Sequence, residues 1–390
     1  MKIAVLTLTH NSNFGATMQC YALSKFLSDK GHEVALLNVH EAFFDRYLRN
    51  NVVPNKKNLG LHIKKIAAKS LGIGEQPPIV YSWHNKVYSM IEEEKKKFSE
   101  FESKYLPPFS EVFLSEKDIA EKGYPKADLY IVGSDQVWNK KITSNNAKLY
   151  FFSFLKDEPR ISYAASLGGS EQLLFSDDEI EQVCNLLKRF NNITVREEVG
   201  KNILNNTFKT NSEIVLDPTL LLDSSIYENI ASTSTIEDEQ FLYHYKFKIN
   251  PEWWSSAELI ANELNLKHRA DWQKHHIKNM NYNPVIGVND WLKLIKTANF
   301  VMTDSYHGML FSIIFKKQFI VVSTDQNSRG RMLPLLKSIG LEDRLFSSYE
   351  EISNNPERWK TIISYDNVYC KLAPQQERSR CLFNYCIESI

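Results

Sequence analysis

The stretch from Thr297 to Val322, TANFVMTDSYHGMLFSIIFKKQFIVV, limits this chain to a small set of folds. Two short apolar runs, Phe300 to Thr303 and Gln318 to Val322, have the composition of buried strands. Between them, Gly308 to Phe315 is apolar on nearly all sides, as expected for a helix packed inside an α/β domain. The turn between strand and helix is therefore where an open parallel sheet binds ligands, and the helix terminus there favours anions. The polar residues of this turn are Thr303, Asp304, Ser305 and His307.

The same alternation of strand and helix recurs along the chain and predicts a doubly wound α/β fold. The opening has a strand over Lys2 to Thr9, a helix over Ala16 to Lys30 and a strand over Glu33 to Asn38. Such a βαβ unit requires a parallel sheet. The fold class is therefore α/β, with two Rossmann-like parallel-sheet domains. Further buried strands are expected at 128–132, 160–165, 193–195, 214–216 and 241–245.

These elements divide the chain into three parts. We expect a first domain at 1–225, a second domain at 226–365 and a helical tail at 366–390 that packs back on the first domain. The polar segment from Ser224 to Glu239 is the predicted linker. An insertion at about 40–108 shows no strand–helix alternation. It includes a basic amphipathic segment at 55–74, which is either a solvated surface helix or a contact with a membrane surface.

Composition excludes several classes of protein. Lysine plus arginine and aspartate plus glutamate both number 47 among 390 residues, so there is no basic surplus for nucleic acid to bind, and nucleic acid is not an expected partner. The five cysteines include no C-x-x-C pair and favour a reduced, cytoplasmic setting. No apolar run approaches the roughly 18 residues of a membrane-spanning helix, and the first apolar run is too short for a signal peptide.

Five stretches, in this order along the chain, carry a family resemblance: HNSNFGATMQCYAL, IVGSDQVWN, SYAASLG, ITVREEVG with VLDPTLLLD, and TDSYHGMLFSIIF. Together they resemble the polysaccharide pyruvyl transferase family from about Met1 to Asp343. The resemblance implies a GT-B-like fold, in which two Rossmann-like domains face a cleft. It also implies transfer of the enolpyruvyl group of phosphoenolpyruvate onto two sugar hydroxyls, which gives a pyruvate ketal and phosphate.

The same resemblance implies the partners of the reaction. Phosphoenolpyruvate is a co-substrate, and no metal, nucleotide or other cofactor is expected. The acceptor is expected to be a saccharide, a lipid-linked or polymeric glycan precursor of a capsule or exopolysaccharide of the bacterial cell surface. The chain would then work in the cytoplasm, with peripheral contact at the inner face of the cell membrane as a further possibility.

Ketal formation from an enol phosphate requires an acid for the methylene carbon and cations for the leaving phosphate. His307 is the candidate general acid or the main phosphate contact, and a polar cap or a hydrogen-bonded core histidine is the alternative. Asp304 either orients His307, accepts a proton from the sugar, or caps the following helix. Ser305 and Gly308 share this turn and complete the expected donor site, although some relatives carry arginine at the position of Ser305.

Three arginines are candidates for binding the donor's phosphate and carboxylate. Arg329 and Arg331 flank a glycine just before a helix that is expected to begin at Arg331, and surface arginines are the alternative. Arg196 directly follows a strand, so its side chain is expected at the mouth of the cleft. An ion pair with Glu197 or Glu198 is the alternative for Arg196.

Two loops of the first domain are expected to bind the acceptor. Gly15 permits close backbone approach at the start of the first helix, and Asp135 is a candidate base for a sugar hydroxyl. Trp138 could stack on a sugar face, with core packing as the alternative. The amides of Asn11 and Asn13 could bind hydroxyls or phosphate, with ordinary turn chemistry as the alternative. Gln136 and Asn139 are expected to bind the acceptor through their amides.

Other functions are weighed against this one. The histidines His244, His268, His275 and His276 lack an H-E-x-x-H spacing, so no metal site is predicted. A GT-B-type glycosyltransferase that uses a nucleotide sugar is the first alternative, although the chain has no Asp-X-Asp triplet and no glycine-rich dinucleotide fingerprint. A non-catalytic carbohydrate-binding protein is the second alternative.

Overall fold

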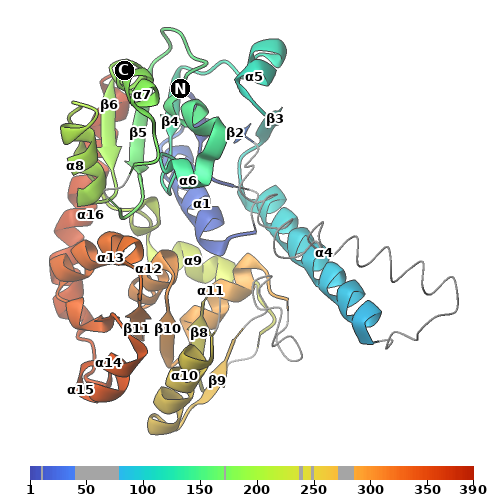
Figure 1. Ribbon diagram of the computed structural model, residues 1–390, viewed down its shortest axis with the longest axis vertical. Helices are drawn as coiled ribbons and strands as arrows, with labels where there is room; N and C mark the ends of the chain where they lie inside the picture. Colours follow the sequence, from blue (N-terminus) through green and yellow to red (C-terminus); the bar gives the residue numbers. More distant parts are fainter. Residues whose placement is uncertain (10–11, 40–78, 171–172, 237–239, 247–249, 271–284) are drawn as a thin grey trace, which may run out of the picture.

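The computed structural model describes residues 1–9, 12–39, 79–170, 173–236, 240–246, 250–270 and 285–390, with the backbone alone at 79–88. Two sheets dominate it, and every strand pair found in either sheet is parallel. The predicted α/β fold with two parallel-sheet domains is confirmed. Figure 1 shows the sheets one above the other, with helices packed between and around them.

The first sheet has the order β3-β2-β1-β4-β5-β6-β7 and the second the order β12-β11-β10-β8-β9. Four strands have the predicted bounds, at 160–165, 241–245, 300–303 and 318–322, because each is a buried and mostly apolar run followed by a polar residue. In chain order, the strands of the two sheets are β1 (Lys2–Leu6), β2 (Glu33–Val39), β3 (Phe109–Phe113), β4 (Leu129–Val132), β5 (Arg160–Ala165), β6 (Asn192–Val195), β7 (Glu213–Ile214), β8 (Phe241–Tyr245), β9 (Lys267–Arg269), β10 (Phe300–Thr303), β11 (Gln318–Val322) and β12 (Leu345–Phe346).

Helices follow most strands, as a doubly wound fold requires. In the first half of the described chain the helices are α1 (Phe14–Asp29), α4 (Ile79–Tyr105), α5 (Glu116–Lys122), α6 (Lys140–Thr143), α7 (Asp177–Leu187), α8 (Glu198–Asn206) and α9 (Ser224–Ala231). In the second half they are α10 (Pro251–Glu263), α11 (Val288–Thr297), α12 (Tyr306–Ile314), α13 (Gln326–Ile339), α14 (Tyr349–Asn354), α15 (Pro356–Lys360) and α16 (Tyr365–Glu388). Short 3-10 turns cover Ser144–Phe151, Pro218–Leu220 and Glu342–Arg344.

The predicted linker is partly wrong, because α9 occupies its first half. Asp223 caps α9 by accepting a hydrogen bond from the backbone of Ser225 at 2.9 Å. Tyr227, Ile230 and Ala231 are buried in the core shared with α11. The segment is polar overall because the other face of α9 is solvated, so composition alone does not show its apolar stripe.

The predicted insertion contains a long helix that its sequence pattern hides. Residues 40–78, with the basic segment at 55–74, lie outside the described part of the chain. The following helix, α4, projects sideways from the two domains (Figure 1). Ile91, Phe98 and Phe101 are buried along it. Three glutamates followed by three lysines, at 92–97, separate Ile91 from Phe98, which obscures the helical spacing of the apolar positions.

The C-terminal helix α16 contacts both domains. Near its start, the hydroxyl of Tyr369 donates to the carbonyl of Ile313 in α12 at 3.3 Å. Near its end, the ring of Phe383 lies 4.0 Å from that of Tyr163 and 5.3 Å from that of Phe26, measured between centroids. The helix therefore fixes the two domains relative to each other, and in Figure 1 it runs along their common side.

Among the described residues, no helix has the length and apolar content needed to cross a membrane.

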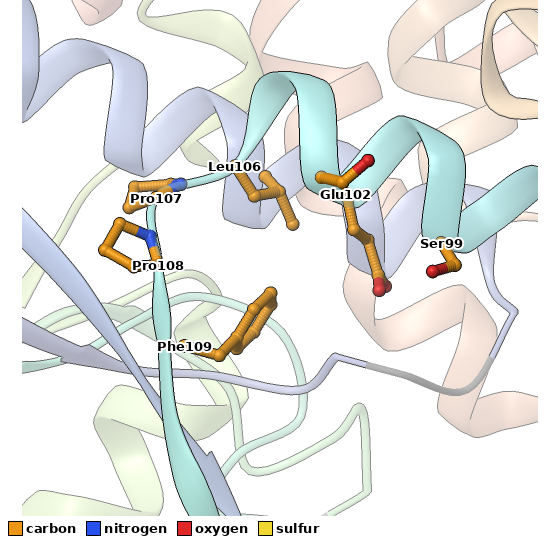
Figure 2. A pocket seen from close by; sticks show the side chains of 7 residues that line it. Ser99, Glu102, Leu106, Pro107, Pro108 and Phe109 are labelled. Carbon is orange, nitrogen blue, oxygen red and sulfur yellow. The ribbon is translucent and has the colours of Figure 1, made fainter.

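A surface hollow of about 460 Å³ lies where α4 turns into β3 (Figure 2). It is lined by Ser99, Glu102, Ser103, Leu106, Pro107, Pro108 and Phe109. Because these residues precede β3, the hollow belongs to the amino edge of the first sheet, away from the carboxyl edge where such sheets bind ligands.

Candidate functional site

The carboxyl edges of the two sheets meet in a buried group of charged side chains. His307, in the first turn of α12, places its Nε2 atom 3.5 Å from Oδ2 of Asp217, which follows β7 of the first sheet. Next to it, the ring of Tyr306 lies 4.3 Å from the guanidinium carbon of Arg196, which follows β6. The second domain thus supplies an imidazole and an aromatic ring to charges that belong to the first domain.

Asp217 is the centre of this group. Its side chain is fully buried. Oδ1 accepts hydrogen bonds from the backbone and the hydroxyl of Thr219, at 3.0 and 2.7 Å. Oδ2 accepts from the hydroxyl of Ser134 and from Nη1 of Arg196, both at 3.0 Å. Burial by itself would raise the pKa of Asp217, but the interactions with His307 and Arg196 hold that pKa well below its ordinary value.

Arg196 is held on three sides. Nη1 contacts Asp217, Nε lies 3.4 Å from a carboxylate oxygen of Glu197, and the face of the guanidinium stacks on Tyr306. The remaining nitrogen, Nη2, is buried and makes no hydrogen bond to any described residue, and it lies 3.8 Å from Oδ1 of Asp135. Burial lowers the pKa of Arg196, but the neighbouring groups raise it above its ordinary value, so the side chain stays charged.

His307 occupies a narrow space between the domains. A distance of 3.5 Å to Asp217 suits an ion pair but is long for a hydrogen bond, and Nε2 makes no hydrogen bond within the described part of the chain. On the other side, a Cβ atom added to Gly15 of α1 would lie 2.2 Å from Nδ1 of the ring. Gly15 is therefore required for the imidazole to fit against α1.

The turn before His307 differs from the prediction in one respect. Ser305, not Asp304, caps α12, because the Ser305 hydroxyl accepts from the backbone of Gly308 at 3.2 Å. Gly308 itself packs so tightly that a Cβ there would lie 2.5 Å from the Thr303 hydroxyl oxygen. Asp304 pairs with Lys246 at 3.2 Å, and the carboxylate found beside His307 is Asp217. The roles of Ser305 and Gly308 in donor binding stay predictions.

The two other predicted arginines lie within α13, which begins at Gln326 rather than at Arg331 as expected. The helix begins earlier because Asp325 caps it, accepting from the backbone of Asn327 at 2.9 Å. Nε of Arg331 and Nη1 of Arg329 are both buried and make no hydrogen bond to a described residue. Burial and the charge of Arg196 lower the pKa of Arg331, so Arg331 lies within electrostatic range of the charged group, although no ion pair joins it to a described residue of that group. No interaction among the described residues joins Arg329 to that group.

A close backbone approach between the two domains brings Arg331 near the charged group. A Cβ on Gly169, in the loop after β5, would lie 1.7 Å from the carbonyl oxygen of Asn327 and 3.1 Å from Cγ of Arg331. A Cβ on Gly330 would in turn lie 2.5 Å from the carbonyl oxygen of Gly169. Two glycines thus let the first turns of α13 touch the first domain.

The residues of the two predicted acceptor loops differ in where the structure places them. Asn11 lies outside the described residues, and Asn13 caps α1 by accepting from the backbone of Ala16 at 3.1 Å. Asp135 has a φ of 73°, a left-handed conformation that is uncommon for residues other than glycine and that occurs at functional sites. Its carboxylate also accepts from the backbone of Gln136 at 2.9 Å.

Gln136 and Asn139 of the 133–139 loop are half-buried, and their role in acceptor binding stays a prediction. Asn139 donates to the side chain of Gln136 at 2.8 Å and caps α6. Trp138 is fully buried, stacks on Phe151 with centroids 5.1 Å apart, and donates its indole N–H to the carbonyl of Tyr150 at 2.8 Å. The prediction that Trp138 stacks on a sugar is therefore wrong, because the whole ring is enclosed in the first domain's core.

The histidines outside the site show no metal centre in the described residues, where no three possible ligands cluster. His244 is in the core and accepts from the indole of Trp253 at 3.1 Å. His268 lies beside it, with ring centroids 5.6 Å apart. His275 and His276 lie outside the described part of the chain.

Sequence reasoning missed Asp217, Tyr306 and Glu197 as site residues. A signal was present for Asp217, which directly follows the predicted strand at 214–216, and for Glu197, which comes next after Arg196, so both lie at the same carboxyl edge as Arg196. Nothing in the sequence singled out Tyr306, whose place depends on contact between the domains.

Replacing Asp217 with asparagine tests the buried ion pairs. Because the pKa of Asp217 is lowered in the folded state, its charge stabilises the fold above the unfolded-state pKa of about 4, and this contribution is lost as the pH falls further. We expect Asp217→Asn to destabilise the protein by about 3–5 kcal/mol at neutral pH. The difference from the unaltered protein should shrink below about pH 4, as measured by urea unfolding at several pH values.

The exposed residue Asp157 supplies the control, since Asp157→Asn removes a carboxylate without touching the buried group. A stability difference for Asp217→Asn that stays constant down to pH 3 would contradict the assignment.

The sequence matches a known protein family. The family model for polysaccharide pyruvyl transferases matches residues 13–326. No curated protein matches the sequence significantly.

Solved structures share the fold at low sequence identity. One is the UDP-GlcNAc 2-epimerase from Methanocaldococcus jannaschii, with 12% identity, a TM-score of 0.50, and coverage of 98% of this chain and 100% of that chain. Another is the UDP-GlcNAc 2-epimerase from Neisseria meningitidis bound to UDP-GlcNAc, with 10% identity, a TM-score of 0.52, and coverage of 100% of both chains. These likenesses show a GT-B-like fold, as expected. Since the family model spans most of the sequence, including both the Arg196 and the His307 turns, this chain belongs to the polysaccharide pyruvyl transferase family.

Proposed function

We propose that this protein transfers the enolpyruvyl group of phosphoenolpyruvate onto two hydroxyls of a saccharide, forming a pyruvate ketal and releasing phosphate. One observation carries the proposal. Three buried nitrogens at the domain junction make no hydrogen bond to any described residue: Nη2 of Arg196, Nε of Arg331 and Nε2 of His307. Buried donors are normally paired, so this arrangement suits a ligand that brings its own acceptors. Phosphoenolpyruvate carries a phosphate and a carboxylate close together, and guanidinium groups bind both.

The proposed reaction assigns one proton to each step. His307 in its protonated form donates to the methylene carbon of phosphoenolpyruvate, which leaves a cationic carbon for the first sugar hydroxyl to attack. That hydroxyl loses its proton to a base, for which the neutral imidazole or Asp135 is available. The C–O bond to phosphate then breaks, the second hydroxyl attacks the same carbon, and its proton leaves with the phosphate. One hydroxyl proton thus balances the new methyl group and the other the released phosphate.

The side chains around His307 suit this role. In this proposal the carboxylate of Asp217, 3.5 Å from Nε2, orients the imidazole. Tyr306 and Gly15 pack against the ring, and His307 is only 7% exposed, so water has little access. Arg196 and Arg331 are placed to stabilise the leaving phosphate, as cations do in phosphoryl chemistry. No step requires a metal, a nucleotide or another cofactor.

The acceptor and location follow from the same proposal. The acceptor would lie against the first domain near Asp135, and a glycan precursor, lipid-linked or polymeric, fits the family. Its use would be in capsule or exopolysaccharide synthesis, on the cytoplasmic side of the membrane with peripheral contact at the inner face. Nucleic acid is not a proposed partner.

The direct test incubates the protein with phosphoenolpyruvate and a panel of galactosyl, mannosyl and glucosyl acceptors. The expected product, seen by mass spectrometry, gains one pyruvate less one water, and phosphate appears in equal amount. Thermal stabilisation by phosphoenolpyruvate but not by UDP-sugars is also expected, because a ligand that binds the folded state raises its stability. Stabilisation by UDP-sugars alone would favour the glycosyltransferase alternative, and binding of glycans without phosphate release would favour a carbohydrate-binding protein.

Replacing His307 with glutamine should remove the acid while keeping a polar side chain of similar reach. We expect turnover to fall by about 100-fold or more, the range for loss of a general acid, with the far-UV circular dichroism unchanged. His32→Gln is the matched control, since His32 precedes β2 at the opposite edge of the first sheet. Near-normal turnover by His307→Gln would exclude the acid role.

Replacing Gly15 with alanine should displace the imidazole without altering any charge. The added methyl would lie 2.2 Å from Nδ1 of His307, so the ring must move. A displacement of about 1 Å can reduce turnover by roughly 100-fold, and we expect a loss of that order. Gly200→Ala in α8 is the control, because a Cβ there makes only ordinary contacts, the nearest at 3.4 Å. Equal kinetics for the two variants would show that His307 does not depend on Gly15.

A further inference from the structure

Glu197 is a buried acid for which neither the fold nor the proposed reaction gives a role. Its residue is only 2% exposed. It stands immediately before α8, at the position where a short polar side chain usually caps the helix, and its own longer side chain makes no capping hydrogen bond. Its carboxylate instead accepts from the hydroxyl of Ser166, whose oxygen in turn accepts from the backbone of Gly168 at 3.1 Å. The side chain is thus directed away from its own helix and into the site.

The carboxylate contacts one guanidinium group directly and is acted on by the charge of a second, which belongs to the other domain. Its second oxygen is 3.4 Å from Nε of Arg196. The charge of Arg331, from α13, also acts on it, as does that of Arg196. Burial raises the pKa of Glu197, and the two arginines and the Ser166 hydroxyl oppose that rise. Two buried guanidiniums repel each other, and the negative charge of Glu197 offsets that repulsion.

The contacts of Glu197 also determine which nitrogens remain available. With Nε of Arg196 beside Glu197 and Nη1 bound by Asp217, only the Nη2 edge of Arg196 is left for a ligand. Nε of Arg331 likewise makes no hydrogen bond among the described residues. Resting on the proposed function, we propose that Glu197 is a positioning residue, which holds Arg196 and Arg331 side by side so that both bind the oxyanions of the same phosphoenolpyruvate.

The test compares Glu197→Gln with Glu198→Gln. Both changes remove one negative charge from adjacent positions, but Glu198 is exposed on α8. We expect Glu197→Gln to raise the KM and the Kd for phosphoenolpyruvate by about tenfold or more, the cost of weakening one charge-assisted hydrogen bond. The value of kcat at saturating donor should change much less, because the acid and the acceptor site are untouched. Glu197→Asp, which keeps the charge, should recover part of the affinity, and Glu198→Gln should match the unaltered protein.

A change in affinity in the opposite direction is equally informative. If Glu197 only repels the anionic donor, Glu197→Gln will bind phosphoenolpyruvate more tightly, and that result, or unchanged binding, overturns the proposal. Should Glu197→Gln fail to fold, Ser166→Ala removes the hydroxyl partner of the carboxylate and is expected to raise the KM in the same direction. Binding is measured by calorimetry with phosphoenolpyruvate alone. No binding by the unaltered protein would contradict the proposed function itself, whereas binding that Glu197→Gln and Ser166→Ala leave unaltered would contradict only the role of Glu197.

Discussion

The buried carboxylate of Asp217 joins the two domains chemically. An ionised group without solvent is stable only where donors and opposite charges replace its lost hydration, and Asp217 obtains them from Thr219, Ser134 and Arg196 of its own domain and from His307 of the other. This arrangement also determines when the site is complete. The imidazole meets its carboxylate only when the carboxyl edges of the two sheets face each other, so the site exists only in the assembled pair of domains.

Several features of the packing keep the domains in that position. The helix α16 contacts α12 at one end and the first domain's aromatic side chains at the other. Glycines at 15, 169 and 330 permit backbone approaches that any Cβ would block. The stacking of Arg196 on Tyr306 adds a cation–π contact across the same junction. The glycine at 15 and the Arg196–Tyr306 stack lie at the charged group itself, whereas the contacts of α16 hold the two domains together elsewhere.

The GT-B-like fold is shared with epimerases that have about one tenth of their residues identical to this chain, so it does not identify the chemistry. The chemistry has to be argued from the side chains at the junction. Buried guanidinium and imidazole nitrogens without hydrogen-bonding partners among the described residues suit a small, multiply charged anion. The unusual backbone of Asp135 lies at the same edge, on the side proposed for the acceptor.

The sequence by itself determined the fold class and the edge at which the site lies. Buried strands such as β5, β8, β10 and β11 are mostly apolar runs followed by a polar residue, so local composition gives their bounds. The turn that carries His307 follows from the same local rule. Only the tertiary structure decided which carboxylate contacts His307, that Trp138 is enclosed in the core, and that α9 fills the expected linker. Those outcomes depend on contacts between residues far apart in the sequence, and neither local apolar spacing nor residue type specifies such contacts.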